Sequence, residues 1–199
     1  MQKVMLLFGS LLLATGGPAM AAVTAIAGGN PSHIALTIPV TAQVATSCSF
    51  APGQAPSGSF TNADIVSGFI NNFGFSLLCN CPSRVAVQSA NGGLLAPLSA
   101  PAGYTNLVPY QVTLNLVGAA DVPTVSATCS AESLKASAAQ PCSFRGPATA
   151  NRGLQLSGPA IETAGSYLKV SAAPFDGSAI PVASNAYADT LTVTVSAAI

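Results

Sequence analysis

The clearest pattern in this chain is an alternation of apolar and polar positions with a period of two. It runs from residue 34 to residue 44, and its apolar members are Ile34, Leu36, Ile38, Val40, Ala42 and Val44. A period of two predicts a β-strand with one buried face. The positions between these residues are smaller or more polar, and one of them is Pro39, which has no backbone N–H to donate. Whether the strand continues past Pro39 is left open by the pattern.

The same alternation returns near the other end of the chain, over residues 187–195. Between the two, shorter strands are predicted at residues 72–79, 84–89, 108–117, 153–156 and 166–171, separated by turn signals such as Asn91-Gly92-Gly93. The sequence predicts an irregular insertion at residues 118–150, with one short helix around residues 131–139. Seven or so short strands between turns predict an all-β, immunoglobulin-like sandwich.

The two ends of the chain suggest how this sandwich is completed. The last predicted strand has Leu191, Val193 and Val195 on one face, and only four residues follow Val195. We expect a sandwich that lacks its C-terminal strand, with a hydrophobic groove left open beside these three residues. The apolar face of residues 34–44 would fit that groove.

Residues 1–21 have the features of a signal peptide. Lys3 precedes an apolar run over residues 4–15, and Ala19 and Ala21 are the small residues that signal peptidase reads. We therefore expect secretion, a leader with the donor or first strand at residues 22–47, and one β-sandwich domain at residues 48–199. No later run reaches the ~18 apolar residues of a membrane-spanning helix.

Charge is scarce in this sequence, at 6% of residues. The chain has little charge with which to resist association. Beyond Lys3 there are five basic and six acidic residues, so the balance favours neither nucleic acid nor an anionic membrane as a partner.

The five cysteines predict disulfides, because the expected compartment is oxidising. Cys129 and Cys142 would close a short loop within the insertion. Cys48 would join the end of the opening strand to a second strand, where Cys79 and Cys81 lie two positions apart and compete for it. The spacing does not decide between them.

No catalytic or metal-binding pattern stands out. The single histidine, His33, has no acidic neighbour nearby, the six carboxylates are scattered among loops as solvated charges, and Gly-x-Ser-x-Gly is absent. Cys79-Asn80-Cys81 lacks the Cys-x-x-Cys spacing of a redox pair. We expect no enzyme, no cofactor and no metal.

Three stretches, taken together and in this order, resemble the spore coat protein U-like domain found in subunits of archaic chaperone–usher pili. They are IALTIPVTAQVATSCSF at the start, FGFSLLCNCPSRVAVQSANGG in the middle and YADTLTVTV at the end. The resemblance implies an incomplete immunoglobulin-like sandwich and a Cys48–Cys79 disulfide. It also implies that the even positions 34–44 are donated to the groove of the next subunit, which is donor-strand complementation.

The same resemblance implies the partners and the location. Neighbouring pilus subunits, a periplasmic chaperone and an outer-membrane usher would bind the chain, which would pass through the periplasm to the cell surface and serve in adhesion or biofilm formation. Two other functions stay open. One is a self-complemented monomeric surface or spore-coat-like protein, and the other is a secreted lectin-like binding module.

Overall fold

The computed structural model describes residues 41–61, 64–177 and 179–198. The chain divides into two units, Met1–Val44 and Ala45–Ile199, and every strand described below belongs to the second unit. The predicted signal peptide, His33 and the donor positions Ile34, Leu36, Ile38 and Val40 lie outside the described residues. No helix in the described part is long and apolar enough to cross a membrane.

The larger sheet has four antiparallel strands in the order β2-β12-β8-β9. Its members are β2 (Phe69–Phe75), β12 (Ser166–Ala172), β8 (Gln111–Leu116) and β9 (Val125–Ser130). The alternation in each strand sends one set of side chains to the core. In β12, for example, Leu168 and Val170 are buried while Tyr167 and Lys169 are partly exposed.

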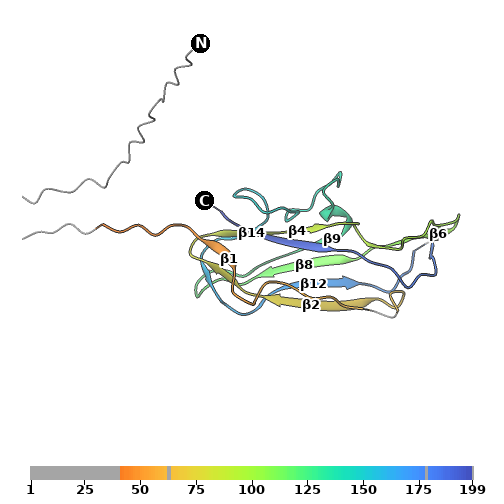
Figure 1. Cartoon of the computed structure of the whole chain (residues 1–199), viewed down its shortest axis with the longest axis horizontal. Coiled ribbons are helices and arrows are strands. Elements are labelled where there is room, and N and C mark those ends of the chain that lie inside the picture. Colours follow the sequence, from red (N-terminus) through yellow and green to blue (C-terminus); the bar gives the residue numbers. More distant parts are fainter. Residues whose placement is uncertain (1–40, 62–63, 178, 199) are drawn as a thin grey trace, which may run out of the picture. The chain divides into compact units, whose positions relative to one another are not determined.

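The facing sheet has three antiparallel strands in the order β10-β4-β14. Its members are β10 (Leu154–Leu156), β4 (Ser83–Ser89) and β14 (Leu191–Ala197). β4 is the central strand and is buried along almost its whole length. β4 and β14 run along the opposite side of the molecule from β2 and β12 (Figure 1).

A third sheet, in the order β1-β3-β11, joins the start of the folded unit to its middle. It consists of β1 (Cys48–Phe50), β3 (Leu77–Cys79) and β11 (Ala160–Ile161). Two pairs of two-residue strands lie in the connections: β5 (Leu94–Leu95) with β7 (Leu107–Val108), and β6 (Tyr104–Thr105) with β13 (Ile180–Pro181).

One hydrophobic core lies between the sheets, which is the arrangement of a β-sandwich. Fully buried side chains come from both sides, with Val85 and Val87 on β4 facing Val112 and Leu114 on β8. The expectation of an all-β chain is therefore confirmed. Burial of these aliphatic side chains is the main favourable contribution to folding, at roughly 1.5–3 kcal/mol for each.

The prediction for residues 118–150 was wrong in two respects. Val125–Ser130 is a regular strand, β9, paired along its whole length with β8. The expected helix at residues 131–139 is reduced to one 3₁₀ turn, η1 (Glu132–Leu134), because Lys135 is already extended and forms a bridge with Ser89 of β4. Pairing with the sheet overrides the helix propensity of this alanine-rich segment.

Candidate functional site: an open groove along the edge strand β14

β14 is an edge strand, since β4 is its only neighbour among the described strands. The backbone hydrogen bonds that flank the pair fix its phase: Ala90 N donates to the Thr190 carbonyl at 3.0 Å, and Ala198 N donates to the Pro82 carbonyl at 2.9 Å. Hydrogen-bonded positions alternate in an antiparallel pair. The even-numbered residues of β14 therefore bond to β4. The backbone N–H and C=O groups of its odd-numbered residues point to the open edge, and these residues are Leu191, Val193, Val195 and Ala197.

The same odd-numbered residues turn their side chains toward the core, yet all of them are only partly buried. Beside Leu191 and Val193 lies a cavity of about 750 Å³. Its floor is Leu168 and Val170 of β12, and its outer wall includes Phe60 and Phe73, whose ring centroids are 6.2 Å apart. We call this cavity with the open edge of β14 the β14 groove. Backbone groups and apolar surface are both left open there, which is the property of a sheet edge that accepts a further strand.

Asp189 anchors the end of the β14 groove where β14 begins. One carboxylate oxygen, Oδ2, accepts hydrogen bonds from Ser89 Oγ and Tyr110 Oη, both at 2.6 Å. The other, Oδ1, accepts from the backbone N–H groups of Asn91 at 2.9 Å and Thr190 at 2.7 Å. Asp189 thus ties the start of β14 to β4 and β8.

The sequence interpretation of Asp189 as a solvated surface charge was wrong. The other five carboxylates are exposed, as expected, but Asp189 is partly buried and fully used as an acceptor. Its partner Tyr110 is buried, and the pKa of the Tyr110 hydroxyl is raised above its ordinary value, chiefly by this burial and also by the hydrogen bond to Asp189. Tyr110 therefore stays neutral and donates.

The chain enters the folded unit beside the β14 groove. β1 lies close to β14 but pairs only with β3. Asn80 fixes the approach to β1, because its side chain accepts a hydrogen bond from Ser47 N and donates one to the Ala45 carbonyl, both at 2.8 Å. Residues 41–47 are exposed and form no strand, so Ala42 and Val44, which the alternation assigns to the donor strand, make no strand pairing there.

The cysteines resolve the alternative that the sequence left open. Cys48 is bonded to Cys79, and Cys129 to Cys142, so both expected disulfides are confirmed. Cys81 is a buried free thiol. The first disulfide ties β1 to β3 across a paired position, and the second ties β9 to the segment that follows η1. Disulfides of this kind indicate an oxidising, extracytoplasmic environment.

The positions predicted from the sequence fall partly in this site. Leu191, Val193 and Val195 line its open edge, with Leu191 and Val193 against the cavity. Within the described residues, no three His, Cys, Asp or Glu side chains gather in a way that could hold a metal ion. Sequence reasoning missed Asp189, Tyr110 and Phe60. The order Tyr-x-Asp-Thr before an alternating strand was the available signal for Asp189.

Searches of family models, of curated proteins and of solved structures found no match to this chain. The resemblance to the spore coat protein U-like domain therefore rests on the three sequence stretches that carry it.

Proposed function

We propose that this protein is a structural subunit of a secreted chaperone–usher pilus, that it polymerises by donor-strand complementation, and that the pilus serves in adhesion or biofilm formation. The observation that carries the proposal is the β14 groove, in which four residues of an edge strand present open backbone groups and half-buried side chains, and two of them, Leu191 and Val193, line a cavity of about 750 Å³. In this proposal the fold is an immunoglobulin-like sandwich that lacks one strand, and an added strand completes it.

The stretch over residues 34–40 has the side chains that such a strand needs. Its even positions are Ile34, Leu36, Ile38 and Val40, which are apolar and large enough to fill the cavity beside β14. Filling it would complete the burial of Leu191 and Val193, which line it. Each buried aliphatic side chain contributes roughly 1.5–3 kcal/mol, so four inserted residues make a stable contact.

Pro39 selects the direction of the added strand. In an antiparallel pair, two residues that exchange both backbone hydrogen bonds lie directly opposite and share a face. If the side chains at the even positions of residues 34–40 fill the groove, the backbone N–H and C=O groups of those residues bond to Val193 and the other odd-numbered residues of β14. Pro39, at an odd position of the added strand, then turns its nitrogen away from β14. In a parallel pair the odd positions would face β14, and Pro39 would leave a carbonyl of β14 without a donor. The added strand therefore runs antiparallel to β14.

The partners follow from the same geometry. A strand donated by one copy to the groove of the next makes a heterologous, head-to-tail contact, which generates an open fibre. Before assembly the β14 groove needs a temporary cover, because an exposed apolar edge on a chain with 6% charged residues invites aggregation. A periplasmic chaperone would supply that cover and an outer-membrane usher would exchange it.

A pair of neighbouring substitutions tests the donor strand. In the mature chain beginning at Ala22, Leu36→Asp puts a carboxylate on the inserted face, whereas Thr37→Asp puts the same charge on the outer face. We expect the first variant to stay monomeric, because burying an unpaired charge is strongly unfavourable, and the second to polymerise like the parent chain. Size-exclusion chromatography with light scattering measures the outcome.

Two results would count against this proposal. Equal polymerisation of the two variants would mean that this strand is not the donor. A parent chain that remains a stable monomer, with its β14 amides protected, would favour the self-complemented surface protein instead.

Competing peptides test the direction of the strand without altering a side chain. A peptide of residues 32–44 added to the mature chain should occupy the β14 groove and shorten the polymers. N-methylation of the Leu36 nitrogen should abolish this effect, because that N–H faces β14 in the antiparallel arrangement. N-methylation of Thr37 should be tolerated, like Pro39. The reverse order would indicate a parallel strand.

A further inference from the structure

Three large apolar side chains are exposed together at one end of the folded unit. Leu98 is 48% exposed, Tyr104 48% and Ile180 61%. Tyr104 and Ile180 are paired directly in the β6–β13 ladder. The two loops that hold these residues, 97–106 and 177–187, contain no Asp, Glu, Lys or Arg. We call Leu98, Tyr104 and Ile180 the tip patch.

The tip patch continues a face that is buried closer to the core. The β5–β7 register, extended past the hydrogen bond from Ala96 N to the Asn106 carbonyl, places Leu98 opposite Tyr104. Asn106 Nδ2 also donates to the Leu98 carbonyl at 2.8 Å, which holds the two arms together. Ala96 and Val108 lie on the same face and are each 2% exposed. A contiguous apolar patch without charge marks an interaction surface.

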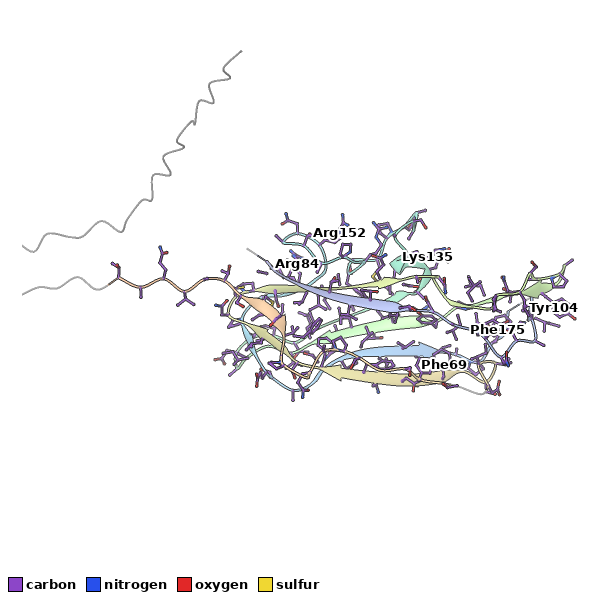
Figure 2. All side chains as sticks on the ribbon, in the orientation of Figure 1. Phe69, Arg84, Tyr104, Lys135, Arg152 and Phe175 are labelled. Atoms are coloured by element: carbon purple, nitrogen blue, oxygen red, sulfur yellow. A yellow bond between two sulfur atoms is a disulfide. The ribbon has the colours of Figure 1, made fainter. Side chains whose placement is uncertain are left out.

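The tip patch and the entry of the chain lie at opposite ends of the folded unit. β4 starts three residues after Asn80, which holds Ser47 at the entry, and it ends at Ser89 before the hairpin of β5 and β7. Figure 1 shows β1 at one end, and Figure 2 shows Tyr104 at the other. We call the end that contains Asn80 the base.

The base has an exposed apolar pair of its own. Leu78 and Ile161 lie directly opposite each other in the β3–β11 pair, so they share the outer face of that sheet. They are 37% and 66% exposed. Leu78 precedes Asn80 by two residues, which places this pair beside the point where the chain enters. We call Leu78 and Ile161 the base patch.

The direction of the donated strand sets the order of these two ends in a fibre, and the inference therefore rests on the proposed function. A strand antiparallel to β14 ends where β14 begins, at Leu191, and this is the tip end of the accepting copy. The folded unit of the donating copy begins at Ala45, immediately after its donor stretch. The base of the donating copy therefore follows the tip of the accepting copy.

The length of the connection decides whether the two ends touch. If the four apolar donor residues occupy the four open positions of β14, Val40 lies opposite Leu191, and five steps from there to Ala45 span at most about 18 Å. Past Leu191 the accepting copy extends three residues to Ala188, which pairs with β5. The hairpin adds three more to Tyr104, which gives roughly 20 Å in all. The connection is no longer than the tip, so it brings the base against it.

We propose that the tip patch of one copy packs against the base patch of the copy that donates its strand. The contact removes five apolar side chains from water. It is too small to hold two chains by itself, since stable interfaces bury about 1,200–2,000 Å². The donated strand supplies the attachment and makes the tip-to-base contact effectively intramolecular. This contact then fixes the angle between consecutive subunits.

An engineered disulfide tests the contact. Tyr104→Cys and Ile161→Cys are introduced together into the mature chain, which is polymerised, oxidised and run on a denaturing gel without reductant. We expect a ladder of linked subunits, because a disulfide forms only where two Cα atoms come within about 7 Å. The two positions lie at opposite ends of one folded unit, so the bond links different copies. Both are exposed, so the fold should not change.

Three controls accompany this variant. Tyr104→Cys with Asn72→Cys moves the second cysteine to an exposed position on β2, away from the base, and should give no ladder. The parent chain shows whether Cys81 links subunits without the new cysteines. Addition of Leu36→Asp to the Tyr104→Cys, Ile161→Cys chain prevents strand donation and should abolish the ladder.

The outcomes separate this inference from the proposed function. Polymers in which the Tyr104–Ile161 pair gives no more ladder than the Tyr104–Asn72 pair would overturn the tip-to-base contact and leave strand donation standing. A chain that forms no polymer at all would overturn both. Linked dimers of a chain with Tyr104→Cys alone, unaffected by Leu36→Asp, would assign the tip patch to a contact between two tips and overturn this inference alone.

Discussion

Strands β12 and β14 are alike in sequence pattern and different in burial. Each has seven residues that alternate in character, and each faces the same core. β12 pairs with β2 on one side and β8 on the other, and its inward Leu168 and Val170 are both 4% exposed. β14 pairs with β4 alone, and its inward side chains are only partly buried.

The comparison shows that alternation decides which face of a strand turns inward but not how completely that face is covered. A second neighbouring strand supplies the side chains that cover it, and β14 has no such neighbour among the described strands. What holds β14 in its place is the pairing with β4 together with the anchor at Asp189.

The largest expected effect separates the two strands directly. Leu168→Ala should lower the free energy of unfolding by about 3 kcal/mol, because it removes most of an aliphatic side chain that is only 4% exposed. Leu191→Ala should lower it by only about 1 kcal/mol, since that side chain is already partly in contact with water. Urea unfolding of both variants in the monomeric Leu36→Asp chain gives the two values. Equal losses would mean that the β14 groove is closed in solution.

The second-largest loss of stability is expected at Asp189, which anchors the start of β14. Asp189→Ala leaves two hydroxyl donors and two backbone N–H groups without their acceptor, so we expect a loss of about 2 kcal/mol in unfolding free energy. Asp176→Ala, at an exposed loop position, is the control and should change stability by less than about 0.5 kcal/mol. If the two substitutions cost the same, the start of β14 is not held by Asp189.

The pH dependence of stability follows from Tyr110. Because its pKa is raised in the folded chain, the unfolded state loses the tyrosine proton first, above its ordinary value of about 10. The unfolded state then binds fewer protons than the folded one, and stability falls as pH rises, by up to about 1.4 kcal/mol per pH unit from this group. Chemical unfolding between pH 9 and 11 should show this decline, and Tyr110→Phe should flatten it.

The smallest effect needs no substitution. Hydrogen exchange should be slow for amides throughout β12, because they bond to strands on both sides. In β14 it should alternate: slow at Thr192, Thr194 and Ser196, which bond to β4, and fast at the odd positions, whose amides point to the open edge. Polymerisation, or addition of the peptide of residues 32–44, should slow hydrogen exchange at the odd-numbered amides of β14 alone. Uniform protection in the monomer would contradict the assignment of β14 as an edge.

The sequence by itself determined the class of the fold and the facing of its strands. Aliphatic alternation over residues 187–195 located β14, although the strand runs from Leu191 to Ala197, and it identified Leu191, Val193 and Val195 as the inward face, because a strand repeats every two residues whatever surrounds it. The turn signal at Asn91-Gly92-Gly93 was equally local, since Gly92 has a φ of +79°, which favours glycine.

Tertiary structure decided what weak local patterns could not. Val125–Ser130 also alternates, but with Ala, Ser and Thr, and it became a strand because β8 offered an open neighbour. Residues 131–139 have alanines suited to a helix, and Lys135 instead pairs with Ser89 of β4. In both segments the hydrogen bonds available from a distant strand outweigh a propensity of a few tenths of a kcal/mol per residue.

Cysteine pairing and the role of Asp189 were also decided by the tertiary structure. Cys79 and Cys81 are equivalent by spacing, and the register of β1 against β3 places Cys79, not Cys81, directly opposite Cys48. Asp189 looks like any loop carboxylate until β4 and β8 bring Ser89 and Tyr110 to it. Tyr110 and Ser89 lie 79 and 100 positions from Asp189 in the sequence. Whether such distant residues meet depends on how the strands associate, and therefore on the energy of the whole core.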